Sequence, residues 1–591
     1  MSNKKTKQKM TKLKGIPLVS GIAMGSVYAF GWAKIDFPKY WVHEGEIQDE
    51  VYRFMKALGA AKRFYSNIIS KIGRIQGREQ INILDSHLLL LQDELLVRSI
   101  TDTIRQNHVN AEWAVHKTIS ELKDAFLKIH QGYMAERQYD IDDIEKALLA
   151  QLMKITFKDL NKVPSDSIVV AYNLSPAELV TLSRIRIAGF VTEIASSNSH
   201  MVIIAKSLGI PSVMGVPDAL RKLSTHDKIL LNGDQGYVIC NPTDQVKKVH
   251  EQLRKDRKKE EDRVMAKARK KAITIDGKIV HIFANVELLE ELSQVTRYGG
   301  EGIGLYRTEF IFLDRTSPPS FEEQKEFYEK VLERMHNHEV IFRTLDLGGD
   351  KIDPNGVVAD EENPALGLRA IRYCLREKHV FSDQLKALLA ASPKGNLKIC
   401  IPMVTSVSEM LEVKSMLADI KKELISKKIP FRDDIPVGVM IETPAAAMEV
   451  DLLAQHADFF SVGTNDLIQY LLAVDRGNQA VQELYSPYHP CIFRVLKNVL
   501  EAAKKWKKEI TLCGEIAADP SCLFLMLALG FERLSMTPWS IPRVKDMIRS
   551  QSLEEMKECL NEVLLKDTER EIQKVVSRYL QTIGESFQGL R

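Results

Sequence analysis

The feature that most constrains the fold of this chain is a series of eight short apolar runs between residues 279 and 535. Helical or longer segments separate consecutive runs. Strands that alternate with helices eight times predict a (β/α)8 TIM barrel, whose active site lies at the carboxyl ends of the parallel strands. The runs are 279–284, 302–306, 340–345, 398–402, 437–441, 459–462, 510–513 and 533–535.

Charged and polar residues stand at or after the ends of several of these predicted strands. Two of them, Glu442 and Asp466, follow neighbouring strands and form the kind of hard-cation site that Mg²⁺ uses, with few protein ligands and room for substrate oxygens. Arginine binds carboxylate and phosphate through its planar fork and keeps its charge. The pattern predicts a site for a small, multiply anionic substrate and phosphoryl chemistry. The set comprises Arg307, Arg343, Arg369, Glu442, Asn465, Asp466, Arg476 and Cys513.

Two of these assignments have plain structural alternatives. Any single arginine in the set can equally form a salt bridge at the rim of the barrel. A lone cysteine such as Cys513 is usually a small buried apolar residue. Its position before Gly514 and Glu515 at the predicted catalytic rim also favours a proton donor or a nucleophile.

The residues before the barrel differ in character from one segment to the next, and together they predict a multidomain α/β protein. Strand-like runs with turns favour a small α/β domain, and we expect Gly15, Gly21 and Gly25 at the turns of its first strands. An almost glycine-free helical stretch, with Asp85 as a plausible N-cap, is inserted into that domain. The segments are a flexible tail (1–13), the α/β domain (14–43 and 156–243), the helical subdomain (44–155), a charged helical linker (244–272) and the barrel (273–591).

Composition excludes several classes of protein. A net charge of +3 over 591 residues is too small to indicate nucleic-acid or membrane partners. The seven cysteines contain no Cys-x-x-Cys pair, which indicates neither a zinc ribbon nor a disulfide framework. The longest apolar run, near residues 522–531, is shorter than the roughly 20 residues that span a bilayer. The lysine-rich start lacks the apolar core of a secretory signal, so we expect a cytoplasmic protein.

A second chemical signal lies in the small α/β domain, where a polar loop ends in His200. A helix is predicted to begin at once, with Ser199 or Asn198 as its N-cap. Free backbone N–H groups at a helix start favour an incoming phosphoryl oxygen, and neutral imidazole is a competent nucleophile. The alternative is an ordinary surface or capping histidine.

Several barrel motifs resemble those of the phosphoenolpyruvate-utilising enzymes. The layout is most similar to the phosphoenolpyruvate–protein phosphotransferase branch, Enzyme I of the bacterial phosphotransferase system. The similarity runs from GIPLVSGIAMG near the start to SIPRVK near the end, and no ATP-binding domain precedes the helical region. We therefore do not expect a pyruvate phosphate dikinase or a phosphoenolpyruvate synthase. The motifs are GIGLYRTEF, RTLDLGGDK, NPALGLRAIR, GVMIETPAAA, FFSVGTNDLIQYLLAVDRGN, LCGEIAADP and SMTPWSIPRVK.

The resemblance implies a reaction and a role for each residue. His200 takes the phosphoryl group of phosphoenolpyruvate and passes it to a histidine of the phosphocarrier protein HPr, as the first step of sugar uptake, with release of pyruvate. The helical subdomain, near residues 85–100, receives HPr, and the barrel domain forms a homodimer. Glu442 and Asp466 hold Mg²⁺, and Cys513 is the proton donor. The residues that bind the substrate are Arg307, Arg343, Arg369, Asn465, Asp466 and Arg476.

The chain departs from the family at the histidine loop. Where the family reads GGxTSH, residues 195–200 read ASSNSH, without either glycine and with Asn198 in place of threonine. Losing glycine removes easy access to positive φ, so we expect a different loop path. This predicts an active but slower phosphotransfer, or an altered carrier preference. The alternatives are a protein that senses phosphoenolpyruvate and regulates, with weakened phosphotransfer, and a dikinase-like enzyme that phosphorylates a small molecule.

Overall fold

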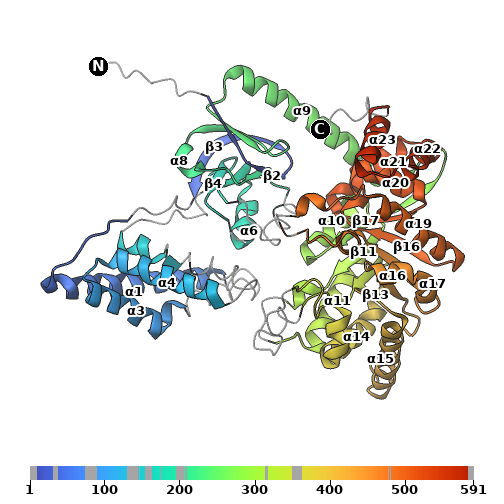
Figure 1. Ribbon diagram of the computed structural model, residues 1–591, viewed down its shortest axis with the longest axis horizontal. Helices are drawn as coiled ribbons and strands as arrows, with labels where there is room; N and C mark the ends of the chain where they lie inside the picture. Colours follow the sequence, from blue (N-terminus) through green and yellow to red (C-terminus); the bar gives the residue numbers. More distant parts are fainter. Residues whose placement is uncertain are drawn as a thin grey trace. The chain divides into compact units, whose positions relative to one another are not determined.

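The computed structural model of the chain divides into two compact units, residues 1–257 and 258–591 (Figure 1). Within them the structure describes residues 10–30, 37–72, 90–129, 163–174, 176–194, 209–312, 317–348, 363–476 and 481–582, with isolated residues and short pieces at 141, 144–145, 147–153, 205 and 478. Apart from the end of the tail, the domain boundaries expected from the sequence remain predictions.

The first unit contains an eight-stranded sheet in the order β1-β8-β7-β3-β4-β5-β6-β2. Neighbours from β3 to β6 run parallel, and the other pairs are antiparallel. Apolar side chains fill both faces of the central strands, as expected for a sheet covered on two sides. The strands are β1 (Thr11–Lys14), β2 (Ile16–Val19), β3 (Ile22–Phe30), β4 (Ile168–Ala171), β5 (Gly189–Thr192), β6 (Ser212–Met214), β7 (Lys228–Asn232) and β8 (Tyr237–Cys240).

Two local expectations for this sheet are wrong. Residues 11–13, which we assigned to the tail, already belong to β1 and pair with β8. Gly15 and Gly21 lie between strands as expected, but Gly25 lies inside β3. A Cβ at Gly25 would lie 2.6 Å from the carbonyl oxygen of Asp166, so this glycine permits a close backbone approach rather than a turn.

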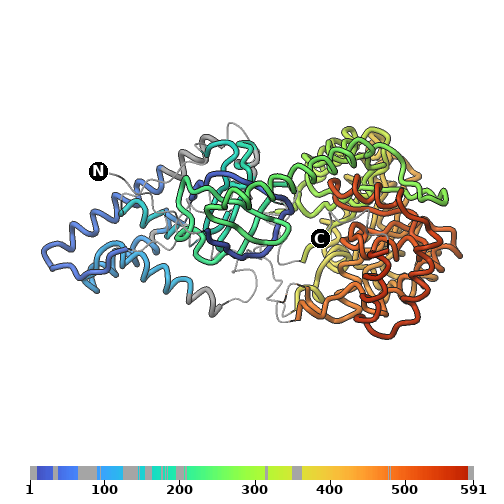
Figure 2. Tube along the Cα trace, turned by 90° about the horizontal axis from the view of Figure 1, so that it is seen from above, coloured from blue at the N-terminus to red at the C-terminus, as the bar shows by residue number. Residues whose placement is uncertain are grey.

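The expected helical region is present in the described residues between 44 and 155. Its long helices are α1 (Ile47–Ile72), α3 (Glu94–Asn107) and α4 (Ala111–Ile129), drawn in blue in Figure 2. They share an apolar core that includes Phe54, Ile104 and Val115. Asp93 caps α3 by accepting a hydrogen bond from the Leu95 N–H at 2.8 Å. The expected cap at Asp85 lies outside the described residues.

The second unit is a closed barrel of eight parallel strands, β10 to β17. It closes because β10 pairs with β17 on one side and with β11 on the other. Every apolar run predicted from the sequence corresponds to one of these strands, so the fold class is confirmed. The strands are β10 (Ile279–Val286), β11 (Gly302–Arg307), β12 (Glu339–Arg343), β13 (Asn396–Ile401), β14 (Val437–Ile441), β15 (Phe459–Gly463), β16 (Glu509–Cys513) and β17 (Arg533–Met536).

Helices surround the barrel, and the chain runs from green through yellow and orange to red as it winds around it (Figure 2). Apolar residues of strands and helices form one large core. A short strand, β9 (Ala272–Ile273), pairs antiparallel with the start of β10. The helices of the second unit include α14 (Lys378–Ala391), α16 (Pro444–Met448), α18 (Thr464–Leu472) and α19 (Pro490–Lys505).

The charged segment before the barrel is helical, as expected. Helix α9 (Asp244–Ala266) covers most of the predicted linker, and the division between the two units falls within it. Among the described residues, no helix is both long enough and apolar enough to pass through a membrane.

Candidate active site

The carboxyl ends of the barrel strands gather most of the residues selected from the sequence. Arg307 ends β11, Arg343 ends β12 and Cys513 ends β16. Glu442 follows β14 directly, and Asp466 stands in the first turn of α18, after β15. Because all eight strands are parallel, these ends lie at the same rim.

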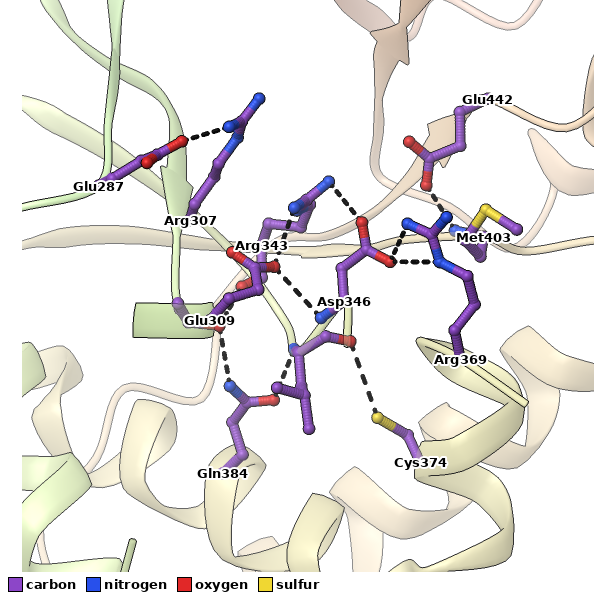
Figure 3. A network of polar contacts seen from close by, with 12 residues as sticks. Glu287, Arg307, Glu309, Arg343, Asp346, Arg369, Cys374, Gln384, Met403 and Glu442 are labelled. Carbon is purple, nitrogen blue, oxygen red and sulfur yellow. Dashed lines mark hydrogen bonds and ion pairs between the residues drawn. The ribbon is translucent and has the colours of Figure 1, made fainter. Parts of the chain in front are cut away.

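Arg369 reaches this rim through the main chain, although it stands far from any strand end in sequence. Gly348 forms an isolated β-bridge with Arg369, and the Ala370 N–H donates to the carbonyl oxygen of Leu347 at 3.1 Å. The Arg369 side chain turns toward Asp346, just after β12 (Figure 3). The structure thus brings Arg343 and Arg369 to one carboxylate.

Asp346 lies between these two guanidinium groups. Its Oδ2 lies 2.8 Å from Arg343 Nη1, and its Oδ1 accepts from Arg369 Nη2 at 2.7 Å and Nε at 3.2 Å. Burial raises the pKa of this carboxyl, but Arg343 and Arg369 outweigh burial and lower it overall. Asp346 is therefore ionised at neutral pH.

A second, largely buried carboxylate, Glu309, supports the same pair. Arg343 Nη2 donates to Glu309 Oε1 at 2.9 Å, and the Asp346 N–H donates to the same oxygen at 3.2 Å. Burial raises the pKa of Glu309, against the opposing effect of Arg343. Arg307, more exposed, pairs with Glu287 (Figure 3).

Glu442, one of the two predicted metal ligands, is buried. Its Oε1 accepts from the Met403 N–H at 2.7 Å, and Met403 has a φ of 57°, a conformation uncommon outside glycine. Burial, with the negative charges of Asp466 and Asp346, raises the pKa of Glu442 to about 8. Thr443 then caps α16 by accepting from the Ala446 N–H, which fixes the chain right after the carboxylate.

The residues around Glu442 fit a divalent cation. A Cβ at Gly463 would lie 2.5 Å from Glu442 Oε2, so only a glycine at this position leaves room for that oxygen. Glu442 and Asp466 are hard oxygen donors of the kind that Mg²⁺ prefers. Within the described part of the chain, no group of three or more His, Cys, Asp or Glu residues is arranged to hold a metal. Substrate and water oxygens would have to complete such a coordination shell.

Cys513 is buried, and its environment distinguishes between the two roles that the sequence left open. Its Sγ lies 3.6 Å from the carbonyl oxygen of Gly304. Burial raises the thiol pKa to about 12, although Ser461 and Ser535 act in the opposite direction. A thiol that stays protonated at neutral pH suits a proton donor and is a poor nucleophile.

Asn465 and Arg476 lie at the side of the site formed by α18 and the segment after it. Asn465 exchanges hydrogen bonds with Glu515, and its carbonyl oxygen accepts from the Tyr485 hydroxyl at 3.2 Å. Arg476 is exposed, and its charge lowers the pKa of Tyr485, which burial raises to about 12. The backbone N–H of Arg476 donates to Gln469 Oε1 of α18 at 3.3 Å, so Arg476 lies against that helix.

The expected nucleophile His200 and its loop, residues 195–200, lie outside the described residues, as does Lys351 in the DLGGDK motif. The polar supports of the rim were missed from the sequence: Glu287, Glu309 and Asp346 as partners of arginines, and Gln384 of α14. Gln384 accepts from the Leu345 N–H and donates to Thr308 Oγ1. Position after a strand could have marked Glu309 and Asp346, but no pattern marks Gln384.

Comparison with family models matches three consecutive parts of the chain. Residues 14–137 match the N-terminal model of PEP-utilising enzymes, residues 163–236 their mobile domain, and residues 261–553 their PEP-binding domain. The barrel rim described above lies within the last match.

Curated relatives extend over almost the whole chain. The phosphoenolpyruvate-protein phosphotransferase of Listeria monocytogenes is 37% identical over 568 residues, covering 96% of this chain and 99% of its own length. The chain belongs to the phosphoenolpyruvate-protein phosphotransferase family. Another phosphoenolpyruvate-protein phosphotransferase, from Haemophilus influenzae, is 36% identical over 96% of this chain and 99% of its own length.

A solved structure, the NMR solution structure of Enzyme I (nEIt), is 26% identical over 42% of this chain and 99% of that chain, with a TM-score of 0.36.

Membership in the phosphotransferase family confirms the resemblance drawn from the barrel motifs and makes the chain an enzyme that uses phosphoenolpyruvate as its phosphoryl donor.

Proposed function

We propose that this phosphotransferase moves the phosphoryl group of phosphoenolpyruvate to its own His200 and then to a histidine of HPr, and releases pyruvate. The observation that carries the proposal is the single rim on which Arg343 and Arg369 stand with the carboxylates Glu442 and Asp466. Such a rim suits a substrate that carries both a phosphate and a carboxylate.

The arginines and Asn465 have the role of binding and orienting this anion. Arg307, Arg343, Arg369 and Arg476 supply permanent positive charge, and the Asn465 amide adds a neutral donor. Phosphoryl transfer depends mainly on positioning and on stabilising charge in the transition state. Arginines held by buried carboxylates need little reorganisation when the substrate arrives.

We assign Glu442 and Asp466 as the residues that would hold Mg²⁺. The space that Gly463 leaves beside Oε2 of Glu442 and the raised pKa of Glu442 support this assignment, since two carboxylates crowded together favour a cation between them. When bound, the metal would neutralise charge on the substrate oxygens.

Cys513 is assigned as the proton donor. The imidazole nitrogen of His200 forms a bond to phosphorus as the bond from phosphorus to the enol oxygen breaks. The resulting enolate then takes a proton from Cys513 Sγ at its methylene carbon and becomes pyruvate. The raised pKa of the thiol supports this role, because the donor must be protonated before transfer.

The first unit would carry the phosphoryl group onward. We place His200 in a domain made of residues 14–43 and 156–243, with 44–155 receiving HPr and 244–272 linking to the barrel, residues 273–591. The match of residues 163–236 to a mobile domain supports this assignment. We also propose a homodimer formed through the barrel domain, and a cytoplasmic location.

The experiment incubates the full chain with Mg²⁺ and phosphoenolpyruvate labelled on phosphorus. We expect acid-labile, base-stable label on the wild type and none on His200→Ala. Adding HPr should move the label to HPr. Absence of label on the wild type would refute the phosphohistidine step, whereas label that never reaches HPr would refute the proposed acceptor. A slow transfer would fit the altered loop at residues 195–199.

A further inference from the structure

We propose that Asp346 is a positioning residue, whose carboxylate holds Arg343 and Arg369 in the geometry that binds phosphoenolpyruvate. The inference rests on the proposed function of the rim. Both oxygens of Asp346 are occupied, Oδ2 by Arg343 and Oδ1 by Arg369 (Figure 3). Asp346 therefore acts through these arginines rather than on the substrate.

The two guanidinium groups keep donors for a ligand after they bind their partners. Each guanidinium has five N–H bonds. Arg343 uses Nη1 for Asp346 and Nη2 for Glu309, while its buried Nε has no partner within the described part of the chain. Arg369 shares its donors between Asp346 and the hydroxyl of Tyr470 at 3.3 Å. The carboxylate fixes the orientation of both groups without exhausting their donors.

The main chain next to Arg369 adopts a strained conformation, which the surrounding structure must hold in place. Ala370, the next residue, has a φ of 52° and a ψ of −129°, which a residue with a Cβ rarely adopts. Its N–H is bonded to Leu347, one residue after Asp346. Side chain and main chain thus tie the Arg369 segment to the end of β12 at neighbouring points.

Asp346 is itself firmly placed. Its side chain is 3% exposed, and its N–H donates to Glu309. The preceding residue, Leu345, donates its N–H to the buried Gln384 side chain at 3.0 Å. A carboxylate fixed in this way holds two long arginine side chains in place before the substrate binds. Binding then costs less side-chain entropy than it would with two free arginines.

The competing explanation is an ion pair that only stabilises the fold. The barrel offers a matched control, because Glu339 at the amino end of β12 also bridges two cations, Lys398 at 2.7 Å and Arg533. Both carboxylates are largely buried. A purely structural role predicts that Asp346→Asn and Glu339→Gln have the same kind of effect.

The experiment measures the rate of His200 labelling against phosphoenolpyruvate concentration in the full chain with saturating Mg²⁺. We expect D346N to raise the half-saturating concentration by about tenfold or more, and D346E to recover part of the loss. E339Q should leave both the half-saturating concentration and the maximal rate within about twofold of the wild type. In a protein that already carries Arg369→Gln, D346N should raise the half-saturating concentration by less than about a further threefold, since the two residues act together.

A folded D346N protein with wild-type saturation behaviour would overturn the proposal, as would full additivity with R369Q. If D346N fails to fold, D346E tests the positioning role instead, because it keeps the negative charge but moves the carboxylate. An unchanged half-saturating concentration in D346E would then overturn the proposal. A wild-type protein that takes no label would instead refute the proposed function, so the two failures are distinguishable.

Discussion

The two ends of the barrel both carry ion pairs, but the pairs have different roles at each end. At the amino ends of the strands, Lys398 lies 2.7 Å from Glu339 and 2.6 Å from Glu509, and Arg533 completes the group from β17. Two acids face two bases there. The Lys398–Glu339 pair joins the neighbouring strands β13 and β12. The pairs Lys398–Glu509 and Arg533–Glu339 join strands that are not neighbours, so they tie the barrel together across its end.

At the carboxyl ends the charges are not balanced one to one. Asp346 is shared by two arginines, Glu442 accepts only a backbone N–H, and Arg343 Nε and the Thr464 hydroxyl are buried without partners among the described residues. Unsatisfied polar groups cost stability and are retained where a ligand uses them. The comparison indicates that the amino end stabilises the fold, whereas the carboxyl end is arranged for a ligand.

The largest expected effect comes from Arg343→Lys. Lysine cannot reproduce the two-pronged contact with Glu309 and Asp346, so two buried carboxylates lose their shared partner. We expect the labelling efficiency with phosphoenolpyruvate to fall by about a thousandfold. The comparable change at the other end, Arg533→Lys, should lower the unfolding temperature and leave labelling within about threefold of the wild type. Equal activity losses in both variants would contradict the division of roles.

Cys513→Ser is expected to slow pyruvate formation by about a hundredfold, the usual size of a general-acid contribution. Because the wild-type thiol has a pKa of about 12, it should also resist iodoacetamide at pH 8 in the native protein. Pyruvate release and alkylation mapped by mass spectrometry measure the two effects. Rapid alkylation of Cys513 under native conditions would show that the site is open and the thiol ionised.

Glu442 predicts a pH effect on the metal-free protein. Its pKa is raised to about 8, so the folded state binds a proton that the unfolded state releases near pH 4.5. Stability contributed by this group is present below pH 4.5 and is lost as the pH rises toward 8, by an amount on the order of a few kcal/mol. Thermal unfolding between pH 6 and 9 measures it.

Glu442→Gln should flatten this pH dependence, and Mg²⁺ should stabilise the wild type near pH 8 but not the variant. Asp451, an exposed acid that accepts hydrogen bonds from Lys505 and Trp506, offers a control outside the rim. If Asp451→Asn flattened the profile as much as Glu442→Gln, the assignment to the buried carboxyl would be wrong.

The smallest effect on activity is expected for Lys398→Met. The change leaves Glu339 and Glu509 with Arg533 alone, so we expect a loss of about 1–3 kcal/mol in the unfolding free energy of the barrel. Labelling kinetics should stay within about twofold of the wild type. Chemical denaturation and labelling rates on the same preparation test this pair of outcomes. A tenfold activity loss without loss of stability would contradict the claim that the amino end of the barrel serves only the stability of the fold.

The barrel strands could be located from the sequence because each is a short, buried apolar run, such as Val437–Ile441, where all five residues are buried. Glu442 and Arg343 could be selected in the same way, since the ends of parallel strands share one rim. Arg369 could be selected only through its motif, because main-chain pairing with Gly348 depends on tertiary structure.

The partners of those residues were harder to foresee. Asp346 and Glu309 were visible after strand ends in the sequence. Their pairing with the arginines depends on which side chains face each other across the rim. The same holds for Glu339, Lys398, Glu509 and Arg533, which look like isolated charges in sequence. Gly25 was misassigned because a glycine that admits a neighbouring carbonyl looks the same as one in a turn.

The central claim is that the carboxyl end of the barrel binds phosphoenolpyruvate together with Mg²⁺. Isothermal titration of phosphoenolpyruvate into the full chain carrying His200→Ala, which prevents turnover, tests it most directly. We predict one site per chain that requires Mg²⁺ and is lost when Glu442→Gln or Arg343→Lys is added, but not when Lys398→Met is added. Binding that is independent of Mg²⁺ or survives both rim substitutions would contradict the claim.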